Sequence, residues 1–177
     1  FSGQGVHRLR RMPNTKGETS LDPEKWTAVK TSFYPYDVNG LECPQVVDST
    51  LLIYLVSAAP LEKEGEVLCL CVFGKQQLHQ VRLQVEGLQT LEVDYSVRSG
   101  EGKVSKKGKV DGLRLTLESE PLVSDRKDVE NFSFLGMQAD IAIHLDPELR
   151  IPLQVSGKIP TIGAVTLKLS EVKMKGH

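Results

Sequence analysis

The pattern of apolar and polar residues changes near residue 65. Before that point, residues 50–59 form an apolar run that follows Asp48-Ser49 and ends at Pro60. Asp and Ser commonly cap the start of a helix and proline ends one, so this run predicts a short helix. Because the run is apolar almost all the way round, we expect the helix to be buried against a sheet.

Beyond residue 65 the apolar residues recur at every second position, which is the period of a β-strand. Residues 67–73 are apolar on both faces and predict a central strand that is covered on both sides. Other runs alternate apolar with polar residues and predict strands with one buried face. These runs are 78–85, 91–97, 113–117, 141–145, 151–155 and 165–172.

Turn-forming residues separate the predicted strands. Gly87 is expected to end one strand, and Asp111-Gly112 favours a tight hairpin. Further turns are predicted at 99–102, Asp146-Pro147 and 157–163. Residues 120–131 are rich in charge and predict a surface loop.

The number and spacing of these strands determine the expected fold. At least seven strands with one short buried helix predict a mainly β protein, built as a curved antiparallel sheet or incomplete β-barrel. A parallel α/β fold is excluded because the segments between strands are too short for crossover helices. We place this single antiparallel β domain at 32–177. Residues 1–31 show no sustained period and predict an irregular N-terminal arm, with one strand within it as an alternative.

Charge and length exclude some partners. The 22 basic and 23 acidic residues nearly cancel, so we expect no nucleic-acid partner. The basic run 103–109 has no aromatic residue for base stacking and is interpreted as a solvated hairpin tip, with a phosphate or headgroup contact as the alternative. No run reaches the roughly 18 apolar residues of a membrane span, so the chain is not expected to be transmembrane. Without an initial methionine or a signal peptide, it is expected to be a processed product or an excised segment.

The three cysteines cannot all pair within one chain. Cys69 and Cys71 lie two positions apart on a predicted strand, so they share one face and cannot readily bridge each other. Cys43 precedes Pro44 in a loop and is able to reach either. Buried, inert thiols are our first interpretation, a single bridge from Cys43 the second, and metal binding the last.

No catalytic or metal-binding signature is present. None of the four histidines, His7, His79, His144 and His177, belongs to a nucleophile–base or zinc-binding pattern. His79 and His144 have mostly polar neighbours and are expected to face solvent. No glycine-rich phosphate loop occurs, and nothing in the spacing of the carboxylates points to a catalytic pair. We therefore expect a non-enzymatic protein without cofactor or metal.

The most distinctive string is DPELRIPLQV at 146–155, followed by Gly163 and the strand 165–169. It resembles the closing hairpin of an exported bacterial family, domain of unknown function 3108, in which an acidic turn leads to an Arg-Ile-Pro strand and a glycine precedes the final strand. A helix followed by a Gly-Glu strand entry, at 61–67 here, is similar to the middle of that family. The resemblance covers roughly 45–172. It implies a periplasmic, curved-sheet protein akin to lipoprotein and lipid carriers, with no established catalytic residues.

The same string also has a purely structural interpretation. Asp146-Pro147 suits a turn, and Pro152 suits an edge strand. Arg150 is able to pair with Asp146 across the turn.

Two functions follow as hypotheses. The first is a cell-envelope protein whose concave sheet binds a lipid or acyl chain, since the strand 67–73 is apolar on both faces and the aliphatic rows are long. The expected lining residues are Leu52, Tyr54, Leu55, Leu83, Val93, Tyr95, Leu115 and Ile143. A solid core is the simpler interpretation of each of these residues taken singly. The second hypothesis is a structural or assembly module that binds another envelope protein through a sheet edge, such as 91–97, or through the aromatic segment 26–36.

Overall fold

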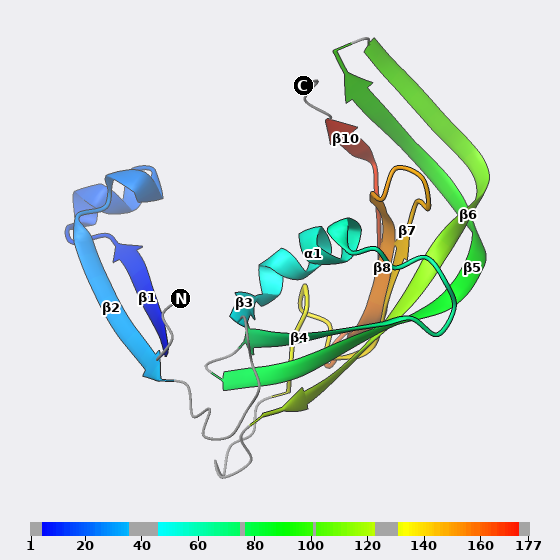
Figure 1. Ribbon diagram of the computed structural model, residues 1–177. Coiled ribbons are helices and arrows are strands. Elements are labelled where there is room, and N and C mark those ends of the chain that lie inside the picture. Colours follow the sequence, from blue (N-terminus) through cyan, green and yellow to red (C-terminus); the bar gives the residue numbers. More distant parts are fainter. Residues whose placement is uncertain (1–4, 36–45, 75–76, 101, 123–130, 174–177) are drawn as a thin grey trace.

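A computed structural model of the chain describes residues 5–35, 46–74, 77–100, 102–122 and 131–173. These residues form a two-stranded ribbon and an eight-stranded sheet, which stand apart in Figure 1. The larger sheet has the order β3-β4-β5-β6-β7-β8-β9, and β10 pairs with β5 off this path. Its strands are β3 (Val46–Asp48), β4 (Val67–Gly74), β5 (Gln77–Ser99), β6 (Gly102–Pro121), β7 (Ala139–Leu145), β8 (Pro152–Ile159), β9 (Gly163–Lys168) and β10 (Glu171–Lys173).

The predicted fold class is confirmed. The protein is mainly β with one short α-helix, and its curved sheet is not closed into a barrel. Antiparallel pairing prevails, and the parallel pairs are β3 with β4 and β10 with β5. The strand expected at 165–172 is divided between β9 and β10, because the chain leaves β8 after Leu169 and then pairs with β5.

The longest strands, β5 and β6, do not end where the sequence predicts. Gly87 does not end a strand; it adopts a positive φ of 102° at a register shift in β5, so that the strand bends and continues. Asp111-Gly112 forms no hairpin either, because it lies inside β6 opposite Thr90 and Gln89. A side chain at Gly112 would come within 3.0 Å of Leu91, so close packing accounts for this glycine. The predicted loop at 120–131 lies mainly outside the described residues.

The bend divides the apolar residues between two clusters. The first contains Leu113, Leu115 and Leu117, which point to one face of β6, as predicted. The second contains Leu91, Val93, Tyr95, Ile151 and Leu153, and Val110 of β6 packs against it. Because Val110 differs in parity from the three leucines, β6 presents opposite faces to the two clusters.

The helix α1 (Leu52–Ala58) covers the first cluster on the concave side of the sheet (Figure 1). A 3-10 turn (Ser49–Leu51) precedes it, and the Asp48 carboxylate accepts a hydrogen bond of 2.8 Å from the Thr50 amide, as expected of a capping residue. Leu52 and Val56 are fully buried. The helix is not buried on all sides as the sequence predicts, because the Tyr54 side chain on its opposite face is 70% exposed.

The C-terminal end of α1 is closed by a residue that is distant in sequence. The Arg150 guanidinium donates hydrogen bonds to the backbone carbonyls of Val56, Ser57, Ala59 and Leu61, at 2.8–3.4 Å. The last carbonyls of a helix lack partners inside the helix and carry its negative dipole end, so a cation is well placed there. Arg150 therefore fixes α1 to the turn between β7 and β8.

Asp146 organises this turn through its backbone and side chain. Its Oδ1 accepts hydrogen bonds from the amides of Glu148 and Leu149, and its carbonyl accepts one from the Arg150 amide. The expected side-chain pair between Arg150 and Asp146 is not formed, because the guanidinium is engaged by the helix. Asp146 Oδ2 lies 3.5 Å from Lys106 Nζ instead, and attraction to Tyr95 and Asp146 raises the pKa of Lys106.

We predict that Arg150→Ala lowers the free energy of unfolding by about 2–4 kcal/mol, because it leaves half-buried helix carbonyls unpaired. Glu148→Ala, an exposed change in the same turn, is the matched control and should stay within about 0.5 kcal/mol. Urea unfolding of both variants measures the difference. Equal stability of the two would contradict a structural role for the guanidinium.

Two histidines occupy different environments from those expected. His79 and His144 are 1% and 3% exposed, because each lies on a strand with neighbours on both sides. His144 Nε2 donates a hydrogen bond of 2.8 Å to the side-chain oxygen of Gln89. Its Nδ1 is buried and has no hydrogen-bond partner in the described part of the chain. Burial, together with the charge of Arg114, lowers the pKa of His144.

This shift predicts a loss of stability in mild acid. In the unfolded chain His144 has a pKa of about 6.5, and below that pH the unfolded state takes up a proton that the folded state does not. Stability therefore falls as the pH decreases from about 6.5 towards the folded-state pKa. We expect His144→Gln to show a smaller loss than the wild type between pH 7.5 and 5.5 in urea unfolding. His7 is exposed, so His7→Gln should show the same change of unfolding free energy with pH as the wild type. If His144→Gln also shows the wild-type change, His144 is not the group responsible.

Strand β4 is not covered on both faces as the sequence predicts. Its partner β3 pairs only with residues 71–73, which leaves 67–70 at an edge of the sheet. Val67 is 39% exposed, and Cys69 is an exposed free thiol, not a buried one. Cys71 is disulfide-bonded, which corrects our first interpretation of it as a thiol. Residue 43, the bridging residue considered from the sequence, lies outside the described residues.

The two cysteines of β4 should consequently respond differently to substitution. Cys71→Ser is expected to lower the free energy of unfolding by about 2–4 kcal/mol under non-reducing conditions, because it removes a covalent constraint on the unfolded chain. Cys69→Ser should change it by less than about 0.5 kcal/mol. Denaturant unfolding with and without a thiol reductant provides the measurement. Reductant should destabilise the wild type and leave Cys71→Ser unaffected; equal effects of the two substitutions would refute the distinction.

The N-terminal arm is more regular than expected. Residues 5–35 contain β1 (Gly5–Met12) and β2 (Ala28–Pro35), which pair antiparallel from Gly5–Pro35 to Met12–Ala28. Two 3-10 turns, Lys16–Ser20 and Pro23–Lys25, connect them. The prediction of an irregular segment was wrong because the residues of this ribbon belong to neither apolar cluster, so the usual contrast between a buried apolar face and a polar face is weak in its sequence. Strand β2 also extends across the boundary that we expected at residue 32.

Candidate functional site

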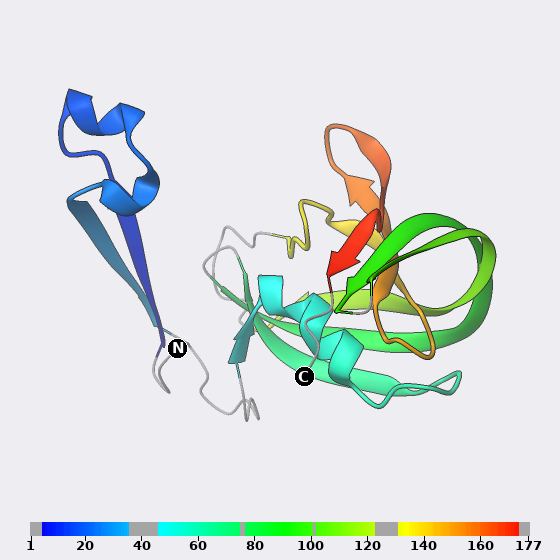
Figure 2. The ribbon, with the colours of Figure 1, turned by 90° about the horizontal axis from the view of Figure 1, so that it is seen from above.

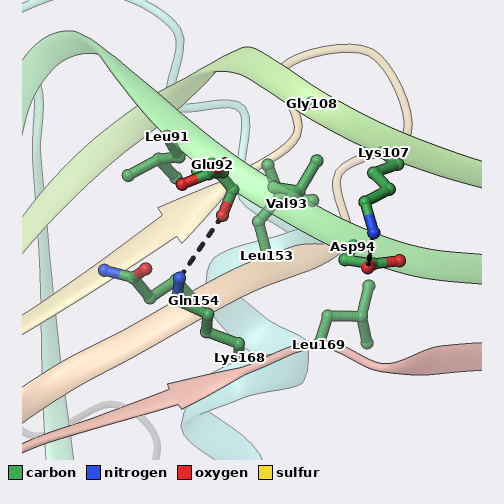
Figure 3. A pocket seen from close by; sticks show the side chains of 10 residues that line it. All are labelled: Leu91, Glu92, Val93, Asp94, Lys107, Gly108, Leu153, Gln154, Lys168 and Leu169. Carbon is green, nitrogen blue, oxygen red and sulfur yellow. Dashed lines mark hydrogen bonds and ion pairs between the residues drawn. The ribbon is translucent and has the colours of Figure 1, made fainter.

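A pocket of about 410 Å³ opens beside the second cluster. Its walls come from the C-terminal half of β5, the facing part of β6, and the strands β8 and β9 (Figure 3). The lining residues are Leu91, Glu92, Val93, Asp94, Lys107, Gly108, Leu153, Gln154, Lys168 and Leu169. These strands meet because β5 bends at Gly87 and β10 returns to pair with its far end.

The floor of the pocket is apolar. Leu91, Val93 and Leu153 belong to the second cluster, and Leu169 packs against them. Strand alternation turns Leu91 and Val93 to the same face, and Figure 3 shows them on the strand opposite Leu153. Among the described residues, those of α1 pack in the first cluster and none belongs to the second, and part of the apolar surface of the second cluster lines an open space.

The rim of the pocket carries balanced charge. Lys107 Nζ lies 2.8 Å from Asp94 Oδ2, and attraction to Asp94 and Glu92 raises the pKa of this lysine. Lys168 Nζ donates to the backbone carbonyl of Glu92 at 3.5 Å and so connects β9 with β5 (Figure 3). The rim thus contains two lysines and two acidic residues, of which Lys107 and Asp94 form an ion pair. The basic run 103–109, interpreted as a solvated hairpin tip, lies along β6 beside the β5–β6 turn, with its lysines exposed.

The structure divides most of the expected lining residues between the two apolar clusters. Leu52, Leu83, Leu115 and Ile143 are fully buried in the first cluster, where α1 fills the concave side of the sheet. Of the two helix residues expected beside Leu52, Tyr54 points to solvent and Leu55 is half-buried. Val93 and Tyr95 belong to the second cluster, and of all eight residues Val93 alone lines the pocket described above.

Several pocket residues escaped the sequence reasoning. Leu91, Leu153 and Leu169 lie in segments that the sequence predicts as alternating strands, so their inward direction could be predicted. That they converge on one pocket could not be predicted, because this depends on the bend at Gly87 and on the pairing of β10 with β5. The rim residues Lys107 and Lys168 carry no local motif that marks them.

Other kinds of site find no support in the described residues. Within the described ranges, no group of three or more His, Cys, Asp or Glu side chains is placed to hold a metal ion. The helices described are all too short or too polar to cross a membrane. No family model, curated protein or solved structure matches the chain. Function is therefore inferred from the pocket.

Proposed function

We propose that the protein is a non-enzymatic component of the bacterial cell envelope that binds the apolar part of a lipid or acyl ligand in the pocket between β5 and β8–β9. The observation that carries this proposal is an apolar floor, built from Leu91, Val93, Leu153 and Leu169, beneath a charged rim. Binding sites for small molecules typically enclose about 300–1,000 Å³ and combine apolar walls with a few polar groups. The pocket lies within that range, and its rim is suited to a polar headgroup.

The chemistry of the lining favours binding over nucleophilic catalysis. Nucleophilic catalysis needs a hydroxyl or thiol beside a base. The ten lining residues include no Ser, Thr, Cys or His. The carboxylate of Asp94 is held in an ion pair with Lys107, and the Lys168 ammonium is bound to a backbone carbonyl.

One observation supports a location in the envelope. Disulfides form and persist mainly in oxidising compartments such as the bacterial periplasm, and Cys71 is disulfide-bonded. The resemblance of 146–155 to an exported bacterial family implies the same compartment, but no family model matches the chain. This proposal differs from our first hypothesis in the expected place of the ligand, which is the pocket beside the second cluster and not the concave face that α1 covers.

A bulky residue in the pocket wall should block the ligand without unfolding the protein. Leu169 is half-buried, so Leu169→Trp fills the pocket with little overpacking of the core. We expect at least about tenfold weaker binding of a fluorescent fatty-acid probe, with a shift of the urea midpoint equivalent to less than about 1 kcal/mol. Probe fluorescence and urea unfolding are measured on the same sample.

Leu167→Trp is the matched control. Leu167 lies on the same segment, is 50% exposed and does not line the pocket, so its replacement should leave probe binding unchanged. A wild-type protein that does not bind the probe would refute the proposal. Equal loss of binding in the two variants would also refute it, because the binding would then not depend on the pocket.

A further inference from the structure

The β1–β2 ribbon is separate from the pocket and presents unpaired strand edges. In both views it stands away from the eight-stranded sheet (Figure 1, Figure 2), and its sheet contains these two strands alone among the described residues. The rings of Tyr34 and Phe73, 6.0 Å apart, provide a contact with β4 at one end of the ribbon. A two-stranded ribbon is only marginally stable by itself, so further pairing would stabilise it.

The two faces of the ribbon differ in chemistry. One face carries Leu9, Val29 and Phe33, whose side chains are 65%, 54% and 46% exposed. The opposite face carries Arg8, Arg10 and Lys30, because Arg8 stands opposite Ser32 and Arg10 opposite Lys30 in the register. Strand alternation thus places three exposed cations opposite the exposed apolar groups, whereas Arg11 shares the apolar face.

The charge of this ribbon is unbalanced. Its two strands contain four basic residues and no acidic residue. Arg11, on the apolar face, donates to the backbone carbonyl of Glu24. In the part of the chain that the structure describes, Arg8, Arg10 and Lys30 have no carboxylate partner. Three cations on one face therefore remain available to a negatively charged partner.

We propose that the outer edge of β1 binds an extended segment of a partner protein, in which acidic and apolar residues alternate. Exposed strand edges pair readily with an added strand, through backbone hydrogen bonds. In an added strand, successive side chains point to opposite faces, so acidic residues would meet Arg8 and Arg10 while apolar residues meet Leu9. Strand β1 suits this partner better than β2, which carries a single cation on that face.

The same arrangement disfavours an anionic membrane surface. A lipid surface would contact one face of the ribbon and would attract cations and apolar groups that share that face. Here Leu9 and Phe33 lie opposite the face that carries Arg8 and Arg10, and Arg11, the cation on their own face, donates to the Glu24 carbonyl. An alternating peptide strand satisfies both faces at once.

The proposal is tested with labelled synthetic peptides of eight residues, the length of β1. The first peptide alternates Glu and Val, the second has the same composition in two blocks, and the third alternates Lys and Val. Fluorescence anisotropy should show saturable binding of the first peptide, at least about tenfold tighter than of either other, and weaker binding at higher salt. Binding of the block peptide with equal affinity would overturn the proposal, as would no binding of the alternating acidic one.

Variants locate the binding edge. Arg8→Glu combined with Arg10→Glu should weaken binding of the alternating acidic peptide at least about tenfold, because attraction becomes repulsion. Lys16→Glu combined with Lys25→Glu makes the same change of net charge on the connecting 3-10 turns and should keep most of the affinity. Arg8→Gln combined with Arg10→Gln removes the two positive charges without introducing negative ones. It controls for unfolding of the ribbon in the Glu variant and should also weaken binding. Unchanged affinity in the Gln variant would overturn the role of these arginines.

Amide hydrogen exchange and vesicles provide independent readouts. Saturating peptide should slow exchange of the amides of residues 6–11, whereas the residues that line the pocket should show no change. Phosphatidylglycerol vesicles should bind no more tightly than phosphatidylcholine vesicles. Unchanged exchange in β1, or preferential binding of the anionic vesicles that is lost in Arg8→Glu with Arg10→Glu, would refute strand addition.

Discussion

The fold depends most on one interaction, the closure of the C-terminal end of α1 by Arg150. A helix of seven residues is too short to persist by itself, and only Leu52 and Val56 of this one are buried completely. Asp48 satisfies the first turn and the Arg150 guanidinium satisfies the last carbonyls. Since Arg150 is held by the turn that Asp146 organises, the helix, the β7–β8 turn and the end of β6 near Lys106 are connected. The concave side of the sheet is therefore occupied by the protein itself.

A second constraint, the bend at Gly87, explains why a pocket exists at all. The register shift turns the far half of the β5–β6 ribbon so that it presents its other face to β8 and β9. The apolar residues there form a cluster of their own, too small to need a helix over it. A continuous flat ribbon would have placed Leu91 and Val93 elsewhere. The pocket is thus a consequence of backbone geometry at one glycine, combined with ordinary strand alternation.

Local features were predictable from the sequence, and long-range features were not. The alternation at 113–117 and the capping role of Asp48 were readable because they depend on residues close in the chain. The hairpin predicted at Asp111-Gly112 was wrong, because the glycine of this pair also permits close packing inside a strand, here against Leu91. The exposure of Cys69 depends on how far β3 extends along β4, and the burial of His144 depends on its position between β6 and β8. The candidate site was predictable only as separate alternating strands, and of the eight residues expected to line it, Val93 alone lies in the pocket.

The wall of the pocket that carries Lys168 and Leu169 is its least supported side. It is held by the hydrogen bond from the Leu169 amide to the Leu153 carbonyl, by the three residues of β10 and by the ion pair between Arg98 and Glu171. The opposite wall belongs to the long β5–β6 ribbon. Short edge strands with exposed hydrogen bonds open at a lower free-energy cost than central strands do. The pocket of the proposed ligand thus combines one rigid wall with one that opens more readily, across which Lys168 donates to the Glu92 carbonyl.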